Sequence, residues 1–223
     1  MTPYIVTGFY TPDYEPLART FEANLDELNI PHRIYSHAFD GGWDRQLMAK
    51  PKIVLTALSD FPRATVVLMD IDCEVRKPIA DVLNFSGDVA LHIRCKQTRN
   101  KYKVYGSSRI IAFRQTSGAR WLAASWLAMC KEAADNPSRR APLCDEHLLT
   151  RAFATTPFVT LSMLPEAYAA FEHDEIGPEA AIVHHSARDK SLKGFTIKRA
   201  LRSLRRRTVE RITGQDYVER KYG

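Results

Sequence analysis

Long apolar runs are missing from this sequence. The longest uncharged apolar stretches, Ala64–Met69 and Trp121–Cys130, fall far short of the roughly 20 residues that a membrane-spanning helix needs. The opening residues, MTPYIVTGFYT, lack the basic and apolar segments of a signal peptide. We therefore expect a cytoplasmic protein that does not span a membrane.

Cysteine is scarce, and its spacing carries no pattern. Cys73, Cys95, Cys130 and Cys144 form no CxxC pair, which argues against a zinc finger. Each has apolar or core-like neighbours along the chain. The sequence therefore predicts buried, reduced thiols rather than disulfides.

Acidic residues are outnumbered in one segment only. Residues 188–223 hold 12 of the 32 basic residues and 4 of the 26 acidic ones, while the rest of the chain is slightly acidic. The formal charge of +6 thus belongs to the tail. We expect no nucleic-acid partner, and we expect that only the tail contacts an anionic surface.

Apolar periodicity indicates an α/β fold. Short apolar runs predict strands, and apolar residues that recur every three or four positions predict helices. The predicted strands are 4–9, 32–35, 65–69, 89–93, 109–113 and 181–183; the predicted helices are 12–28, 50–61, 118–134 and 145–153. Alternating strands and helices imply βαβ units with parallel strands. One domain over residues 1–192 with a tail over residues 193–223 is the simplest organisation.

Two acidic residues follow the most apolar predicted strand. Asp70 and Asp72 come after Thr65–Met69 (TVVLM), a run typical of a strand buried on both faces. Ligands of open α/β sheets bind beyond the carboxyl ends of the strands. Two carboxylates there are unfavourable unless a cation joins them, and Mg²⁺ or Mn²⁺ with a substrate phosphate fits. Capping of the next turn is the alternative.

The segment VVLMDIDCEVRKPIADVL, from Val66 to Leu83, resembles the metal-binding segment of GT-A glycosyltransferases, most closely family 8. The resemblance implies a GT-A fold, a Rossmann-like mixed sheet flanked by helices. It also implies that Asp70 and Asp72 hold Mn²⁺ (or Mg²⁺) against the diphosphate of a nucleotide sugar, with a UDP-sugar favoured as donor.

A second segment, Ile182–Lys190 (IVHHSARDK), is similar to the family's apolar–apolar–His … Lys motif. The likeness implies that His184 is the third metal ligand and that Lys190 contacts the diphosphate. The Gly-Pro and the tryptophan that the family has around this lysine are missing here. A structural role for His184 and His185 is the alternative.

The segment Cys144–Leu149 (CDEHLL) resembles the family's Asp-Gln-x-x-Leu helix start. The likeness places Asp145 at the sugar or acceptor and Glu146 near the reacting carbon, as candidate catalytic residues. The preference of acidic residues for helix N-termini explains the pair equally well.

Looser matches concern the donor. The strand end with Thr7, Phe9 and Tyr10 lies where the family seats the nucleotide base, and Lys50 and Lys52 lie one helix before the acidic pair. A strand–loop junction and a solvated helix face explain them as well. Gly106-Ser107-Ser108 falls where the family has a turn, without a role that carries over.

Residues 196–213 combine an apolar stripe with arginines, a pattern of amphipathic helices that lie on anionic membranes. Family 8 enzymes that elongate lipid-linked glycans have similar tails. We therefore expect peripheral attachment at the inner membrane face and a glycan or lipid-linked acceptor. A helix docked on the body is the alternative.

The sequence thus predicts a metal-dependent transferase that moves a sugar from a nucleoside-diphosphate sugar to an acceptor hydroxyl. Phosphohydrolases of the haloacid dehalogenase type also place DxD after an apolar strand, but near the N-terminus and before small residues, whereas Cys73-Glu74 follow here. A non-catalytic membrane-binding module is the other alternative.

Overall fold

The computed structural model describes residues 3–38, 48–98, 101–135, 144–171 and 179–185. Its strands are β1 (Tyr4–Tyr10), β2 (His32–Ser36), β3 (Thr65–Met69), β4 (Cys73–Val75), β5 (Val89–Thr98), β6 (Lys101–Phe113), β7 (Leu161–Met163), β8 (Ala170–Phe171) and β9 (Ile182–His184). Its α-helices are α1 (Glu15–Glu27), α3 (Ala49–Asp60), α4 (Ser117–Asp135) and α5 (Asp145–Thr155), and 3₁₀ turns span Pro12–Tyr14, Ala80–Leu83 and Glu166–Tyr168.

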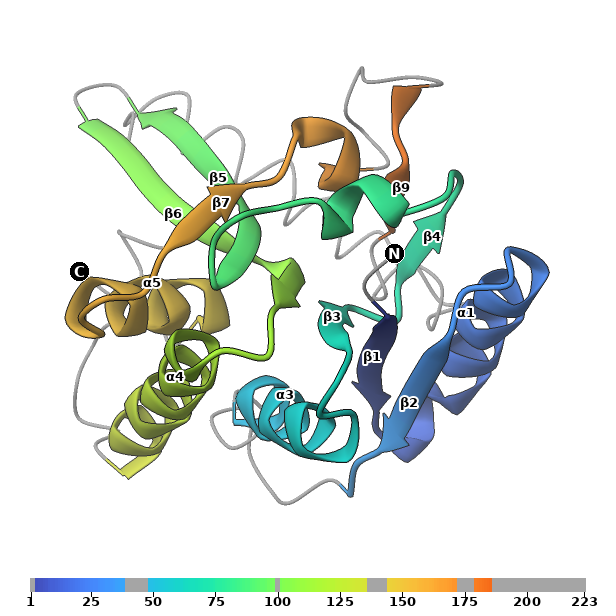
Figure 1. The fold of residues 1–223 in the computed structure, drawn as a ribbon, viewed down its shortest axis with the longest axis horizontal. Coiled ribbons are helices and arrows are strands. Elements are labelled where there is room, and N and C mark those ends of the chain that lie inside the picture. Colours follow the sequence, from blue (N-terminus) through green and yellow to red (C-terminus); the bar gives the residue numbers. More distant parts are fainter. Residues whose placement is uncertain (1–2, 39–47, 99–100, 136–143, 172–178, 186–223) are drawn as a thin grey trace, which may run out of the picture.

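A six-stranded mixed sheet in the order β2-β1-β3-β6-β5-β7 forms the centre (Figure 1). β1 pairs in parallel with both β2 and β3, which confirms the predicted parallel strands. β6 runs antiparallel to β3 and to β5. Since β1 and β3 point the same way, both end at one edge of the sheet, and Asp70 lies at that edge.

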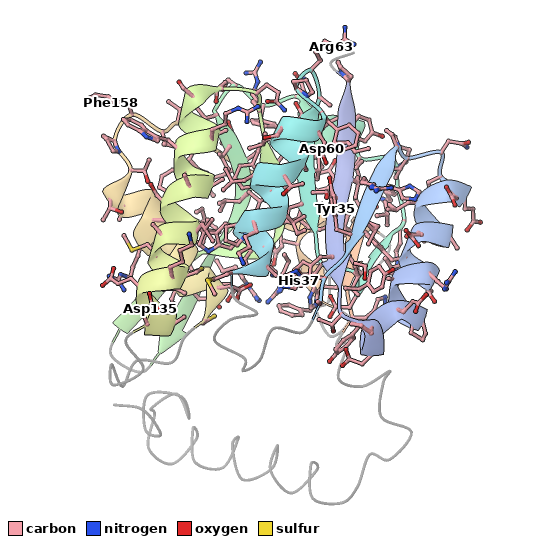
Figure 2. The ribbon with its side chains drawn as sticks, turned by 90° about the horizontal axis from the view of Figure 1, so that it is seen from below. Tyr35, His37, Asp60, Arg63, Asp135 and Phe158 are labelled. Atoms are coloured by element: carbon pink, nitrogen blue, oxygen red, sulfur yellow. The ribbon has the colours of Figure 1, made fainter. Side chains whose placement is uncertain are left out.

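Apolar side chains cover both faces of this sheet. On one face α3, α4 and α5 pack against alternate strand residues, and Figures 1 and 2 show α3 and α4 side by side there. On the other face lie α1 and a smaller sheet, β4-β9-β8. The continuous apolar run of β3 follows from this arrangement, because all five of its residues are buried.

Two polar contacts tie the outer elements to the sheets. The hydroxyl of Tyr35 in β2 donates to the carboxylate of Asp60 at the end of α3, at 2.9 Å (Figure 2). The amide of Asn24 in α1 donates to the carbonyl of Val75 at 3.0 Å and accepts from its N–H at 2.8 Å. Asn24 therefore pairs with the outer edge of β4 as a neighbouring strand would.

The hairpin of β5 and β6 differs from the sequence prediction. Both strands are longer than 89–93 and 109–113, because they pair beyond the body of the sheet as far as Thr98 and Lys101. Gly106–Ser108 lies inside β6, so the turn expected there is wrong. The all-buried expectation for cysteine is also wrong, because Cys95 lies on this extension and is exposed.

The remaining cysteines agree better with the prediction. Cys73 and Cys130 are buried, Cys144 is half-buried, and all four thiols are free. In the part of the chain that the structure describes, no helix has the length and apolar character to cross a bilayer. Lys190 and the predicted tail helix lie outside the described residues.

Candidate functional site

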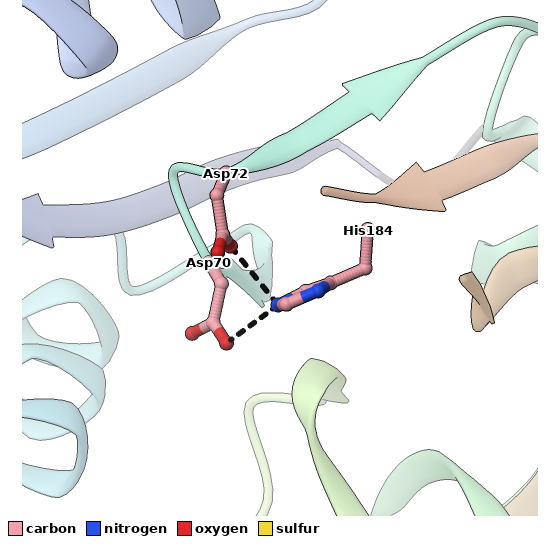
Figure 3. Close-up of side chains that lie close together, drawn as sticks. All are labelled: Asp70, Asp72 and His184. Atoms are coloured by element: carbon pink, nitrogen blue, oxygen red, sulfur yellow. Dashed lines mark ion pairs between the residues drawn. The ribbon is translucent and has the colours of Figure 1, made fainter. Parts of the chain in front are cut away.

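Asp70, Asp72 and His184 come together at the carboxyl edge of the central sheet. One ligand atom from each lies within 4.8 Å of the others. Figure 3 shows the His184 ring directed at both carboxylates: its Nε2 lies 3.0 Å from Asp72 Oδ1 and 3.6 Å from Asp70 Oδ2. The structure thus joins two segments more than 100 residues apart.

Backbone hydrogen bonds fix these three residues. The N–H of Asp70 donates to the carbonyl of Arg109 in β6, at 3.0 Å, and the carbonyl of Asp70 accepts from the N–H of Cys73. The turn between them leads into β4, where Cys73 is the register partner of His184 in β9. The N–H of His185 donates to the carbonyl of Asp72 at 2.8 Å, which closes the cluster from the other side.

Within the cluster, His184 forms ion pairs with Asp70 and Asp72. Burial acts to lower the pKa of His184, but hydrogen bonds to Asp70 and Asp72 outweigh burial and raise it to about 9. Burial acts to raise the pKa of Asp70, but Lys50 and His184 outweigh it and lower the pKa. At neutral pH the imidazolium therefore occupies the place of a cation between two carboxylates.

The donor set fits a hard divalent cation. Carboxylate oxygens with one imidazole nitrogen suit Mn²⁺, and Mg²⁺ accepts the oxygens. Nε2 of His184 faces the carboxylates, whereas its Nδ1 is buried with no hydrogen-bond partner among the described residues. Nε2 is therefore the atom that would bind the metal.

Lys50 at the start of α3 lies between this cluster and α5. Its Nζ is 2.8 Å from Asp70 Oδ1 and 2.7 Å from Asp145 Oδ2, and its side chain is only 12% exposed. Burial acts to lower the pKa of Lys50, but Asp145 and Asp70 outweigh it and raise the pKa. Lys50 is therefore a fixed cation that links the predicted metal ligands to the predicted sugar site.

Asp145 and Glu146 open α5, and their pKa values shift in opposite directions. Burial acts to raise the pKa of Asp145, but Lys50 and the hydroxyl of Ser108, which donates at 2.8 Å, lower it to about 2. Among the described residues Glu146 has no such partner at short range, and burial raises its pKa. The closest cation to Glu146 among the described residues is Arg109, at 3.8 Å.

Sequence reasoning missed several residues of this site. Ser108 binds both Lys50 and Asp145 through its hydroxyl. Arg109, on the opposite face of β6, extends toward Glu146 and lies over the ring of Phe171. An arginine beside the apolar residues IIAF of a buried strand was the available signal in the sequence.

The other residues named from the sequence lie on β1 and α3. Thr7 is fully buried, and its hydroxyl donates to the carbonyl of Arg33. The ring of Phe9 packs edge to face against that of His37, with ring centres 5.8 Å apart. Tyr10, the last residue of β1, is half-buried. Lys52 is exposed on α3.

His185 is the neighbour that the sequence set aside as a ligand. Its Nε2 lies 2.7 Å from Glu74, away from Asp70 and Asp72. The pairing of His185 with Glu74 agrees with the choice of His184 as the metal-facing histidine.

Neither a protein-family model nor a curated protein matches the sequence. Solved structures match it by fold. A glycosyltransferase involved in the glycosylation of the major capsid of PBCV-1 has a TM-score of 0.62 and 13% identity, over 85% of this chain and 97% of that one.

Two further glycosyltransferases are similar. GlyE of Streptococcus pneumoniae TIGR4 gives a TM-score of 0.59 at 15% identity, over 88% of this chain and 58% of GlyE. The galactosyltransferase LgtC, solved with donor and acceptor sugar analogues, gives 0.51 at 8% identity, over 81% of this chain and 86% of LgtC. These likenesses confirm the GT-A fold, a mixed sheet flanked by helices.

Proposed function

We propose that the chain is a metal-dependent glycosyltransferase that moves a sugar from a nucleoside-diphosphate sugar to an acceptor hydroxyl. The observation that carries the proposal is the Asp70–Asp72–His184 cluster at the carboxyl edge of a GT-A sheet. The similarity to glycosyltransferases in fold supports it. A UDP-sugar is the favoured donor, and a glycan or lipid-linked glycan is the proposed acceptor.

Asp70, Asp72 and Nε2 of His184 would hold Mn²⁺ or Mg²⁺. Such an ion neutralises the charge that grows on a departing diphosphate. His184 must give up the proton on Nε2 before the ion binds, since the same atom cannot hold both. Lys190 would add positive charge at the diphosphate; it lies outside the described residues.

The carboxylates of α5 would serve the sugar side of the site. Asp145 stays ionised at any physiological pH, with a pKa of about 2, so it is suited to accept hydrogen bonds from sugar hydroxyls. Lys50 and Ser108 hold its orientation. Burial raises the pKa of Glu146, the direction of shift that strengthens a carboxylate as a base, and Glu146 would face the acceptor hydroxyl.

Thermal melting with Mn²⁺ and a panel of UDP, GDP and CDP tests the proposal. A nucleotide at 100 times its Kd adds about 2.7 kcal/mol to the free energy of unfolding, which raises Tm by about 5 to 10 °C for a chain of this size. We expect this shift with one nucleotide, only when Mn²⁺ is present.

Two variants complete the test. Asp72→Ala should abolish the shift, and Asp26→Ala, which removes an exposed carboxylate at the end of α1, should keep it. If no nucleotide raises Tm in the presence of metal, or if the Asp70→Asn/Asp72→Asn double variant still transfers sugar, the proposed function is wrong.

Membrane attachment through residues 193–223 stays a prediction. Co-sedimentation of the full chain with vesicles that contain anionic lipid, compared with neutral vesicles, tests it. Binding that does not depend on vesicle charge would contradict an arginine-mediated attachment.

A further inference from the structure

Two arginines from neighbouring strands lie over one aromatic ring beside the metal cluster. The guanidinium carbon of Arg109 in β6 is 3.5 Å from the centre of the Phe171 ring, and that of Arg94 in β5 is 4.4 Å from it. The same ring packs edge to face against His184, with ring centres 5.5 Å apart. The arginine pair therefore adjoins the proposed metal site through a single side chain.

Among the described residues, this pair carries more positive charge than its neighbours offset. In the described part of the chain, the carboxylate that pairs with Arg109 is Glu146, at 3.8 Å, and no carboxylate pairs with Arg94. Nη1 of Arg109 is buried and has no hydrogen-bond partner among the described residues. Two guanidinium groups that share one ring also repel each other, and a buried donor without an acceptor is unfavourable. Both features would be relieved by an anion.

We propose that Arg94 and Arg109 form a subsite for a carboxylate or phosphate group carried by a sugar substrate. Guanidinium groups bind both anions through paired N–H donors. The inference rests on the proposed glycosyl transfer, and it narrows the substrates to sugars that carry a negative charge. The group belongs either to the transferred sugar of the donor or to the acceptor, and the experiment below separates the two.

The position of Arg109 argues for the sugar rather than for the diphosphate of the donor. Arg109 reaches toward Glu146 in α5, on the side of the site assigned to the sugar and acceptor. The diphosphate is assigned to the metal held by Asp70, Asp72 and His184.

The test measures binding to the full-length protein with Mg²⁺ at fixed ionic strength, with and without UDP. The free sugars are glucuronate, glucose 6-phosphate and glucose, and the donors are UDP-glucuronate, UDP-glucose and UDP. The variant is Arg94→Gln. Its control is Arg114→Gln, because Arg114 follows the last residue of β6, is exposed, and also lies over a phenylalanine ring, that of Phe85, with its guanidinium carbon 6.0 Å from the ring centre.

We expect charged sugars to bind at least about tenfold tighter than their neutral counterparts, the size of one charge-assisted hydrogen bond. Arg94→Gln should remove that preference, and Arg114→Gln should keep it. A preference confined to UDP-glucuronate assigns the anion to the donor, and one confined to the free sugars assigns it to the acceptor.

Three results would overturn the subsite: equal binding of charged and neutral sugars by the wild type, a preference that survives in Arg94→Gln, or a loss of UDP affinity in Arg94→Gln as large as the loss for charged sugars. The last would assign the arginines to the diphosphate. Failure of UDP itself to bind tests the proposed function separately, because the free sugars are also measured without it.

Discussion

The charge of Lys50 is the clearest point at which to perturb the site. Its Nζ lies within 2.8 Å of Asp70 and Asp145, and all three side chains are at most 22% exposed. Replacement by methionine keeps the length of the side chain and removes the charge. Two buried carboxylates then face each other without the cation that joins them.

The structure sets the size of the effect. The pKa of Asp145 is about 2 against an ordinary 3.8, and loss of that difference alone corresponds to about 2 kcal/mol at neutral pH. Asp70 loses the same partner. Removal of one member of a buried ion pair typically costs about 3–5 kcal/mol. We therefore expect Lys50→Met to lower Tm by about 10 °C at pH 7.

The pH dependence gives the sign of the effect. A carboxyl with a lowered pKa stabilises the folded state above its ordinary pKa, and this stabilisation is lost as the pH falls toward the lowered value. In Lys50→Met, burial and mutual repulsion raise the pKa of both carboxyls, so that the folded variant takes up protons in mild acid. The difference in stability between wild type and variant should therefore narrow between pH 7 and pH 5.

Urea unfolding followed by circular dichroism at both pH values measures the difference. Lys52→Met is the matched control, since Lys52 is exposed on the same helix, and it should change the stability by less than about 0.5 kcal/mol. The free energy of unfolding of Lys50→Met could lie within about 1 kcal/mol of the wild-type value, the size of one ordinary hydrogen bond, or the difference between the two could be the same at both pH values. Either result would show that Lys50 does not neutralise Asp70 and Asp145.

Two further predictions concern the elements that hold the metal ligands. Asn24→Ala removes both hydrogen bonds to the backbone of Val75, so it should lower the free energy of unfolding in urea by about 1–3 kcal/mol and weaken Mn²⁺ binding through β4. The control Glu27→Ala, at an exposed position of the same helix, should change neither quantity. Normal Mn²⁺ affinity in Asn24→Ala would contradict the link between α1 and the site. Mn²⁺ must displace the proton that His184 holds with a pKa of about 9, so calorimetry in two buffers should detect about one proton released per ion at pH 7. The affinity for Mn²⁺ should rise about tenfold from pH 7 to pH 8, because the proton competes less at higher pH. An affinity for Mn²⁺ that is the same at both pH values would refute competition between the ion and the proton.

The sequence predicted the elements of the first βαβ units well, because local patterns determine them. The run TVVLM is apolar at every position, and β3 is buried on both faces. The acidic pair follows directly from that strand. Placement of His184 against it required the family resemblance, since no local pattern links residues more than 100 positions apart.

Residues whose role depends on long contacts could not be predicted. Lys50 and Ser108 are 58 positions apart, and nothing near Lys50 in the sequence distinguishes a buried ion pair from a solvated helix face. The strands β4, β7 and β8 have only two or three residues, too few for a period of two to appear. Cys95 is exposed because the hairpin extends beyond the sheet, and its immediate neighbours in the sequence, Arg94 and Lys96, do not tell how far the two strands pair.

Each carboxylate of the described cluster already has a cationic partner without a metal. Lys50 joins Asp70 to Asp145, and the imidazolium of His184 joins Asp70 to Asp72. A divalent ion therefore replaces a proton rather than filling a site of bare negative charge. Ion binding therefore raises the net charge of the site by one unit and not by two. Because the carboxylates already have cationic partners, a diphosphate that arrives with the ion supplies negative charge that the protein does not. Metal and nucleotide should accordingly bind more tightly together than either binds alone, and equal affinity for UDP with and without Mn²⁺ would show that the carboxylates do not bind the ion in this way.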